Sequence, residues 1–233
     1  MKKIDTYKNE FSKKGYVVIK NFLKKKEVEE FNKYLFITYS KKLNRKIDKK
    51  NIHNILKKLE NNKMYDQLYK ALKSYNKTIP FKNIAKRLNK YSKLIFKNNF
   101  KYAATGMAVG IGGSKRTSYE WHQEKPYYKN DSTIHYQFPI LLPCNKLNGT
   151  MSVLVGSNRL GFIKRVNNKK LSKKSINSFI PKNINSIKSR FYEKFINMKL
   201  KDIVLFSENI IHRTNKNTSN KVRFAGIIRL KKI

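Results

Sequence analysis

The sequence predicts an α+β fold with a mainly β core and flanking N-terminal helices. Residues 5 to about 98 read mainly as helix, with apolar residues near helical spacing in 27–36, 52–59, 64–75 and 84–96. From residue 101 onward, short apolar segments alternate with turn signals, as in an all-β sandwich or barrel. Helices that precede the strands, instead of alternating with them, favour a helical layer packed against this β core.

The strands are predicted one by one from the same pattern. Residues 15–19 form a β-branched run after a glycine and predict one early strand within the helical part. Later strands are expected at 102–111, 134–142, 151–155, 202–206 and 222–230. Residues from about 167 to 194 fit neither pattern and are interpreted as an insertion between strands. We therefore expect one domain over 1–233, helix-rich over about 1–98 and β-rich over about 101–233.

Composition excludes several classes of protein. The chain has 233 residues, of which 39% are hydrophobic, so it can bury a substantial core. Apolar runs are too short to cross a membrane, and the N-terminus lacks the apolar stretch of a signal peptide. Cys144 is the only cysteine, which rules out an intrachain disulfide and a multi-cysteine zinc site. A cytoplasmic protein is the expectation.

The formal net charge of +40 has two interpretations. A basic protein can bind nucleic acid by releasing counterions from phosphates. Here, however, the basic residues are overwhelmingly lysines, spread along the whole chain, and arginine is scarce. Nucleic-acid sites favour arginine for bidentate contacts, so the charge is better explained as a solvated basic surface.

The spacing around one histidine predicts a metal site. His122 and Glu124 stand at positions i and i+2, so on an extended segment both side chains point to one side. His212 follows a strand-like segment and supplies a third ligand. Two histidines and one carboxylate form a facial triad, which leaves positions on iron(II) open for oxygen and a chelating co-substrate.

A downstream arginine predicts the co-substrate. Arg223 follows His212 by eleven residues, and a short turn between two strands would bring both into one cavity. A buried guanidinium is costly unless it pairs with an anion, and its fork matches a carboxylate. The anion that we infer is the distal carboxylate of 2-oxoglutarate. Thr214, two residues after His212, could donate a hydrogen bond to the same carboxylate.

The chain resembles the phytanoyl-CoA dioxygenase family of iron- and 2-oxoglutarate-dependent oxygenases. The resemblance is carried by residues 11–23, 27–28, 121–124, 126–128, 139–141, 148–157 and 202–206, and by His212, Thr214 and Arg223. It implies a double-stranded β-helix (jelly roll) with helices outside. It assigns His122, Glu124 and His212 to iron(II), and Arg223 with Thr214 to 2-oxoglutarate. It also implies that Gln137 lies near the co-substrate, and that Tyr127 and Tyr128 line the substrate pocket.

Two residues depart from the pattern of the family. Its usual metal-binding carboxylate is aspartate, where this chain has Glu124, and it usually has histidine where this chain has Asn158. Glu124 keeps the charge and the donor oxygens, and argues against halogenation, for which the relatives have a small residue here.

The expected function is therefore that of a dioxygenase using iron(II), 2-oxoglutarate and O2. It would hydroxylate an unactivated C–H bond of a small metabolite and release succinate and carbon dioxide. One alternative is a cupin-like metal isomerase or epimerase without redox chemistry, which would not need Arg223 and Thr214. A second alternative is a basic nucleic-acid-binding protein, whose binding would survive the loss of His122 or His212.

Overall fold

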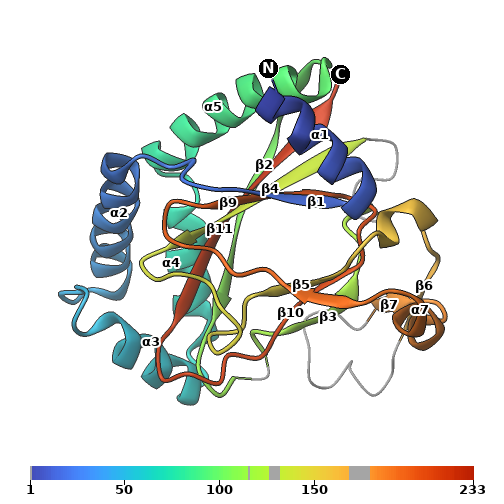
Figure 1. Cartoon of the computed structure of the whole chain (residues 1–233). Coiled ribbons are helices and arrows are strands. Elements are labelled where there is room, and N and C mark those ends of the chain that lie inside the picture. Colours follow the sequence, from blue (N-terminus) through green and yellow to red (C-terminus); the bar gives the residue numbers. More distant parts are fainter. Residues whose placement is uncertain (1, 115, 126–131, 168–178) are drawn as a thin grey trace.

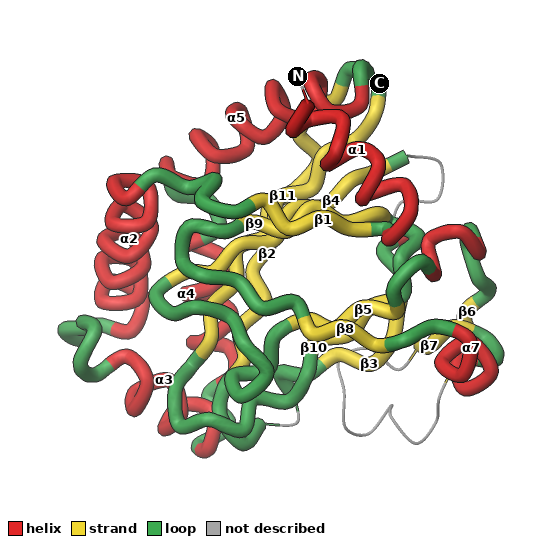
Figure 2. Tube along the Cα trace, viewed as in Figure 1, coloured by secondary structure: helices red, strands yellow, loops and turns green. Residues whose placement is uncertain are grey.

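The computed structural model describes residues 2–114, 116–125, 132–167 and 179–233, and two antiparallel sheets form its centre (Figure 1). The larger sheet has the strand order β1 (Tyr16–Ile19), β9 (Ile203–Ser207), β4 (Thr133–Ile140), β11 (Arg223–Lys232) and β2 (Phe100–Gly110). The smaller sheet has the order β3 (Tyr119–His122), β10 (His212–Thr214), β5 (Met151–Leu154) and β8 (Glu193–Phe195). The sheets face one another across a shared interior (Figure 2), and the predicted fold class is confirmed.

A layer of helices covers the outer face of the larger sheet (Figure 1). Its members are α1 (Lys2–Lys14), α2 (Lys25–Leu43), α3 (Ile52–Asn61), α4 (Tyr65–Tyr75) and α5 (Ile79–Phe96). Rings from three elements meet in this layer, where Phe31 and Phe81 pack on Phe138 at centroid distances of 5.0 and 6.1 Å. The predicted helices are confirmed, although α2 runs on to Leu43. It stops there because Asn44 adopts a left-handed conformation with φ of 48°.

Alternation along the strands gives the larger sheet two different faces. Phe224, Ile228 and Leu230 of β11 join the apolar cluster under the helices, whereas Ala225 joins a second cluster between the sheets. Side chains alternate between the faces of a strand, so Arg223 and Arg229 point to the same interior as Ala225. By the same rule β4 turns His135 and Gln137 inward, because its even-numbered neighbours lie under the helices.

A small unit packs on the outer face of the smaller sheet. The strands β6 (Arg165–Asn167) and β7 (Phe179–Pro181) pair with each other, and α7 (Ile184–Arg190) follows them. Ile187 of α7 packs in a cluster with Trp121, Leu154 and Ile211. Of these elements, β7 and α7 fall within the predicted insertion near 167–194, whereas β6 begins two residues before it. Residues 168–178 of the insertion lie outside the described residues.

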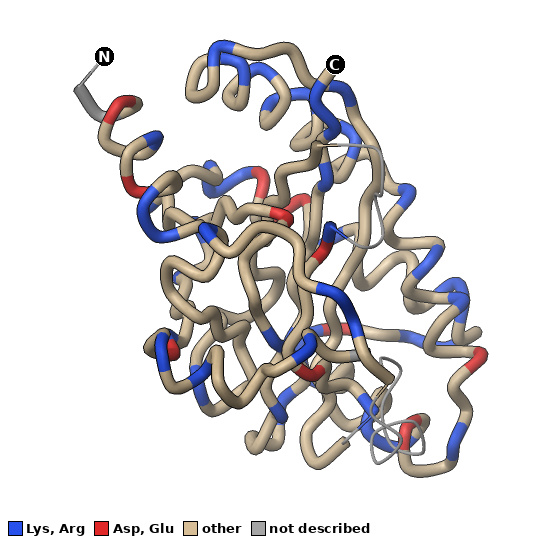
Figure 3. The backbone as a smooth tube through the Cα atoms, turned by 90° about the vertical axis from the view of Figure 1, so that its right-hand side faces the viewer, with Lys and Arg blue, Asp and Glu red and all other residues tan. Residues whose placement is uncertain are grey.

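Charge is spread over the whole trace. Lysines and arginines occur along almost every part of the backbone, with acidic residues far fewer among them (Figure 3). Within the described ranges, no helix is long and apolar enough to cross a lipid bilayer.

The close packing beneath the helices gives a first prediction. A Cβ added at Gly226 of β11 would lie 2.5 Å from the Phe138 ring. That ring is fully buried between Phe31 and Phe81, so it has no free space to move into. We expect Gly226→Ala to lower the free energy of unfolding by about 1–3 kcal/mol in urea titrations, the usual cost of overpacking.

A compensating variant checks the cause. Phe138→Leu in the Gly226→Ala background removes the clashing edge of the ring and should recover part of the loss, although Phe138→Leu alone destabilises. Strictly additive losses would contradict this account.

Candidate active site

Antiparallel pairing brings three potential metal ligands together. His212 of β10 lies directly opposite His122 of β3, and on its other side opposite Val153 of β5. Glu124 follows two residues after His122, where its backbone N–H donates to the carbonyl of Glu208 at 3.0 Å. One ligand atom from each of His122, Glu124 and His212 lies within 4.8 Å of the other two, so the cluster could hold one metal ion.

The orientations of the two imidazoles suit a metal. The Nδ1 atom of His122 lies 2.7 Å from the carbonyl of Glu120, and that of His212 lies 3.1 Å from the carbonyl of Ile210. A carbonyl only accepts, so each Nδ1 carries the proton and each Nε2 keeps its lone pair. The two Nε2 atoms lie 4.0 and 3.7 Å from Oε1 of Glu124. Backbone acceptors thus fix both rings in the tautomer that binds a metal.

Burial and neighbouring charges lower the pKa values of two members of the cluster, His122 and Glu124. Burial, helped by the nearby His212, lowers the pKa of His122 to about 4. Burial alone would raise the pKa of Glu124, but Arg229, together with His212 and His135, holds that pKa well below its ordinary value. At neutral pH His122 is therefore a neutral imidazole and Glu124 a carboxylate, the forms that bind divalent metals.

Gln123, between the two predicted ligands, holds their segment in place. Its amide donates to the carbonyls of Gly161 and Asn209 at 2.7 and 2.6 Å, and its oxygen accepts from Ile163 N–H at 2.9 Å. Sequence analysis missed this role, because the partners are distant in sequence and the side chain faces away from the metal ligands.

Arg229 is a second residue that sequence analysis missed. Its Nε lies 3.5 Å from Oε2 of Glu124, the carboxylate oxygen that turns away from the histidines. The signal was its position on β11, six residues after Arg223 and hence on the same face of the strand.

The predicted 2-oxoglutarate residues occupy both sheets. Arg223 is 1% exposed, and its Nε and Nη2 atoms have no hydrogen-bond partner in the described part of the chain. Gly110 lies opposite Arg223 on β2, and a Cβ there would approach the guanidinium to 3.3 Å, so the glycine leaves room for it. Gln137 is also buried, with Oε1 lacking a partner among the described residues. Thr214 lies across the interior on β10, and no hydrogen bond between the described side chains joins it to Arg223.

The remaining candidate residues, and the two histidines outside the cluster, lie in different places. Tyr127 and Tyr128 lie outside the described residues. Asn158 is turned toward α1, where its amide donates to the carbonyl of Ser12 at 3.2 Å, so it packs against the helix end.

His53 accepts from Val222 N–H at 3.0 Å and is structural. His135 is fully buried in the interior, 3.0 Å from Thr133 Oγ1 and stacked on Phe206.

A buried His-Glu-His cluster between the sheets of a double-stranded β-helix defines a metal-dependent oxygenase type of site. A family model described as phytanoyl-CoA dioxygenase (PhyH) matches residues 11–225. The chain belongs to the phytanoyl-CoA dioxygenase family, and the predicted class of enzyme, a 2-oxoglutarate-dependent oxygenase, is confirmed. No curated protein matches the sequence significantly.

Solved structures share the fold at low sequence identity. EctD from S. alaskensis with bound Fe aligns with a TM-score of 0.66 at 14% identity, over 96% of this chain and 75% of that one. The epimerase SnoN, in complex with Fe3+, alpha ketoglutarate and nogalamycin RO, aligns with a TM-score of 0.67 at 10% identity, over 99% and 84% of the chains. The carbocyclase SnoK from nogalamycin biosynthesis gives a TM-score of 0.64 at 13% identity, over 97% and 83%.

The bonds of Gln123 give a second prediction. Gln123→Leu keeps the side-chain size but leaves two carbonyls and one N–H without partners. We expect it to lower the free energy of unfolding by about 1–3 kcal/mol and to weaken metal binding, measured by urea titration and calorimetry. Gln67→Leu, on the exposed face of α4, is the matched control and should change neither quantity. Equal effects of the two substitutions would count against a specific role for Gln123.

The buried histidines give a third prediction, for the metal-free protein. Burial lowers the pKa of His135 to about 3, and that of His122 is about 4, against an ordinary value of 6.5. The unfolded chain therefore takes up these protons first as the pH falls. Their contribution to stability is complete above pH 6.5 and is lost as the pH falls toward the folded-state values. Each histidine should add about 1.4 kcal/mol per pH unit to the slope of stability between pH 4.5 and 6.5.

His135→Asn tests that slope, because asparagine is polar but does not titrate. Urea unfolding of the metal-free variant from pH 4.5 to 6.5 should show a slope smaller by one proton. A slope equal to that of the wild type would show that His135 does not keep its lowered pKa in the folded protein.

Proposed function

We propose that this chain hydroxylates an unactivated C–H bond of a small molecule, using iron(II), 2-oxoglutarate and O2. The observation that carries the proposal is the Arg223 guanidinium, buried in the same interior as His122, Glu124 and His212, with two of its nitrogens lacking a partner among the described residues. A fixed cation without an anion is costly in a protein interior, so its presence there favours a ligand that brings the missing negative charge.

The residues present fit an iron(II) ion. Two imidazole nitrogens and one carboxylate oxygen converge from β3, β10 and the segment after β3. Three ligands on one side of a metal leave the opposite side open for a chelating co-substrate and oxygen. A structural metal site, in which four protein ligands surround the ion, would leave no such position open.

The residues also fit a dicarboxylate. A guanidinium binds a carboxylate through parallel hydrogen bonds, and both Nε and Nη2 of Arg223 are available for them. Gln137 could add an amide hydrogen bond from the same sheet, and Thr214 a hydroxyl from the opposite one. The far end of 2-oxoglutarate would thus be held between the two sheets.

When bound, iron(II) and 2-oxoglutarate supply the oxidising chemistry, and succinate and carbon dioxide leave as by-products. The protein contributes binding and orientation. His122, Glu124 and His212 hold the metal, while Arg223 sets the direction from which the co-substrate approaches it. The apolar side chains Ala225, Val204 and Phe206 border the interior and limit the access of water.

A cavity between the helices α3 and α4 and the edge strand β2 is our candidate for the substrate. It has a volume of about 220 Å3 and is lined on one side by Met107, Ala108 and Val109 of the edge strand β2. Tyr119, on the edge strand β3, lines its other side and contacts the His122 ring at a centroid distance of 6.1 Å. Its remaining lining is mostly leucine and tyrosine from α3 and α4. These features suit a small molecule with an apolar part.

The test of the proposal is an anaerobic titration with iron(II) and then 2-oxoglutarate, followed by the visible charge-transfer band of the chelate. We expect the band in the wild type and its loss in His212→Ala. Arg223→Ala should need roughly 100-fold more 2-oxoglutarate, because hydrogen bonds worth ~3 kcal/mol are lost. Arg213→Ala is the matched control, since Arg213 points outward from β10 and pairs with Glu193 at 2.8 Å.

Two results would overturn the proposal. One is the absence of the band in folded, metal-loaded wild type. The other is an equal 2-oxoglutarate requirement in Arg223→Ala and the wild type. Succinate formed in step with O2 consumption would distinguish the oxygenase from a non-redox isomerase, which consumes no O2.

A further inference from the structure

The two oxygens of Glu124 have different neighbours. Oε1 faces the histidines, at 3.7 Å from His212 Nε2 and 4.0 Å from His122 Nε2. Oε2 lies 3.5 Å from Arg229 Nε, which makes this an ion pair and not a hydrogen bond, since Arg229 Nε has no hydrogen-bond partner among the described residues. The carboxylate thus presents one oxygen to the candidate metal position and the other to a cation on the opposite sheet.

The neighbouring strand β2 leaves space for the guanidinium of Arg229. Its strand partner on β2 is Ala104, and Gly106 lies beside its guanidinium, where a Cβ would come within 2.8 Å of Nη1. The absence of a side chain at Gly106 therefore lets the guanidinium lie against the sheet. Within the described part of the chain, Glu124 is the carboxylate with which Arg229 forms an ion pair. Water screens this pair only weakly, since the side chains of Arg229 and Glu124 are 18% and 11% exposed.

The length of the Glu124 side chain lets it contact both the histidines and Arg229, an arrangement that we call the Glu124 bridge. An aspartate at position 124 would be shorter by one carbon–carbon bond, about 1.5 Å. Its carboxylate could approach either the two histidines or Arg229, but a side chain of that length would not keep both sets of distances. Glutamate spans them, with one oxygen for each side.

We propose that Arg229 is a positioning residue for the metal centre: it holds Oε2 of Glu124 and so presents Oε1 as a single-oxygen ligand. This inference rests on the proposed function. It adds a residue from the larger sheet to a site whose ligands otherwise come from β3, β10 and the segment after β3.

The direction in which the loss of Arg229 changes metal affinity distinguishes a positioning role from a purely electrostatic one. The charge of Arg229 repels a divalent cation, so if charge alone mattered, removing it would tighten metal binding. If Arg229 positions Glu124, removing it releases the carboxylate and weakens binding, typically by about 10–100-fold for a residue that orients a metal ligand.

The experiment measures cobalt(II) affinity, by calorimetry and by the visible spectrum of the bound ion, in the absence of 2-oxoglutarate. The variants are Arg229→Met, Arg229→Lys, Glu124→Asp and the double variant Glu124→Asp with Arg229→Met. We expect Arg229→Met to weaken binding by about 10–100-fold, with Arg229→Lys in between. In the Glu124→Asp background, where the bridge cannot form, Arg229→Met should change the affinity by less than about threefold.

Arg87→Met is the matched control for the loss of an arginine–glutamate pair. Arg87 pairs with Glu27 at 2.6 Å in the helical layer, so its loss should reduce stability without changing cobalt affinity. Circular dichroism establishes that each variant is folded, and Arg229→Lys keeps the test decisive if Arg229→Met does not fold.

Three outcomes would overturn the inference. They are tighter binding in Arg229→Met, unchanged binding, and an equal loss in the wild-type and Glu124→Asp backgrounds. Wild type that binds no cobalt would overturn the proposed function and this inference with it. Wild type that binds cobalt while Arg229→Met binds it equally well would overturn the inference alone.

Discussion

The pairing of β10 with β3 is the interaction on which the site depends. It places His212 opposite His122, with ring centroids 4.2 Å apart, and so joins the two halves of the candidate ligand set. The ladder is supported from behind, where Trp121, Leu154 and Ile211 pack under α7. It is supported from the side by Gln123, which links the segment after β3 to the loops at 161–163 and 209. The geometry of the histidines therefore follows from backbone pairing and packing.

The larger sheet carries polar groups on its interior face, and these groups are costly to bury. Arg223, Gln137 and His135 all point into the space between the sheets. The apolar cluster on the other face of the same strands, built from β4, β11 and the five helices, offsets that cost. Strand alternation lets one sheet supply both functions, with a helix-packed face for stability and a polar face for ligands. A one-residue register slip of β11 would exchange the two faces and destroy both.

Sequence patterns predicted much of this arrangement, for identifiable reasons. The strands β1, β2, β4, β5, β9 and β11 were predicted from apolar runs between turns, whereas the short strands β3 and β10, which carry the histidines, were not. The inward direction of Arg223 follows from alternation along β11. The contacts of Gln123 could not be predicted, because they join residues up to 86 positions apart. Alternation along β11 could have predicted that Arg229 points into the interior, but it could not have predicted the contact with Glu124. The bridge to Glu124 depends on how far the two sheets stand apart, and on the space that Gly106 leaves, and neither is encoded in local sequence.

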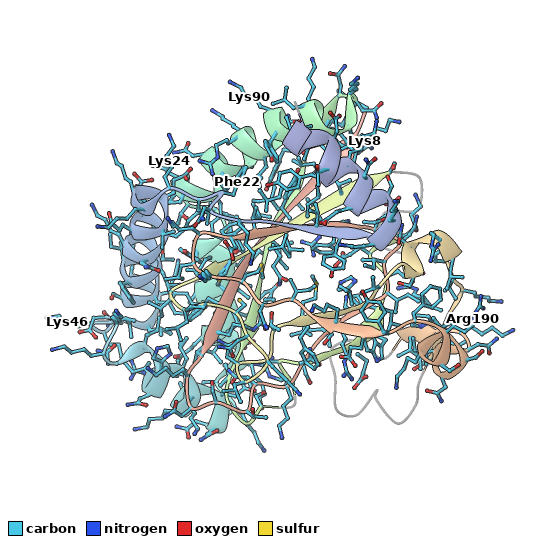
Figure 4. The ribbon with its side chains drawn as sticks, in the orientation of Figure 1. Lys8, Phe22, Lys24, Lys46, Lys90 and Arg190 are labelled. Atoms are coloured by element: carbon cyan, nitrogen blue, oxygen red, sulfur yellow. The ribbon has the colours of Figure 1, made fainter. Side chains whose placement is uncertain are left out.

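The different placement of lysines and arginines helps to identify functional arginines, which strand alternation alone does not. The chain is rich in lysine, and labelled cations such as Lys46 and Lys90 extend from the surface (Figure 4). Arginine is scarce, yet Arg87, Arg116, Arg213 and Arg229 each pair with a glutamate, and Arg223 is the largest fully buried side chain among the described residues. A guanidinium stays charged and offers a rigid fork of donors, whereas an ammonium is strongly hydrated and is better placed in water. In a chain whose surface charge is carried mainly by lysine, an arginine whose side chain points into the interior marks a place where the shape of the guanidinium can be used. That reasoning points to Arg223 and Arg229 together, one placed for a co-substrate and the other for a metal ligand.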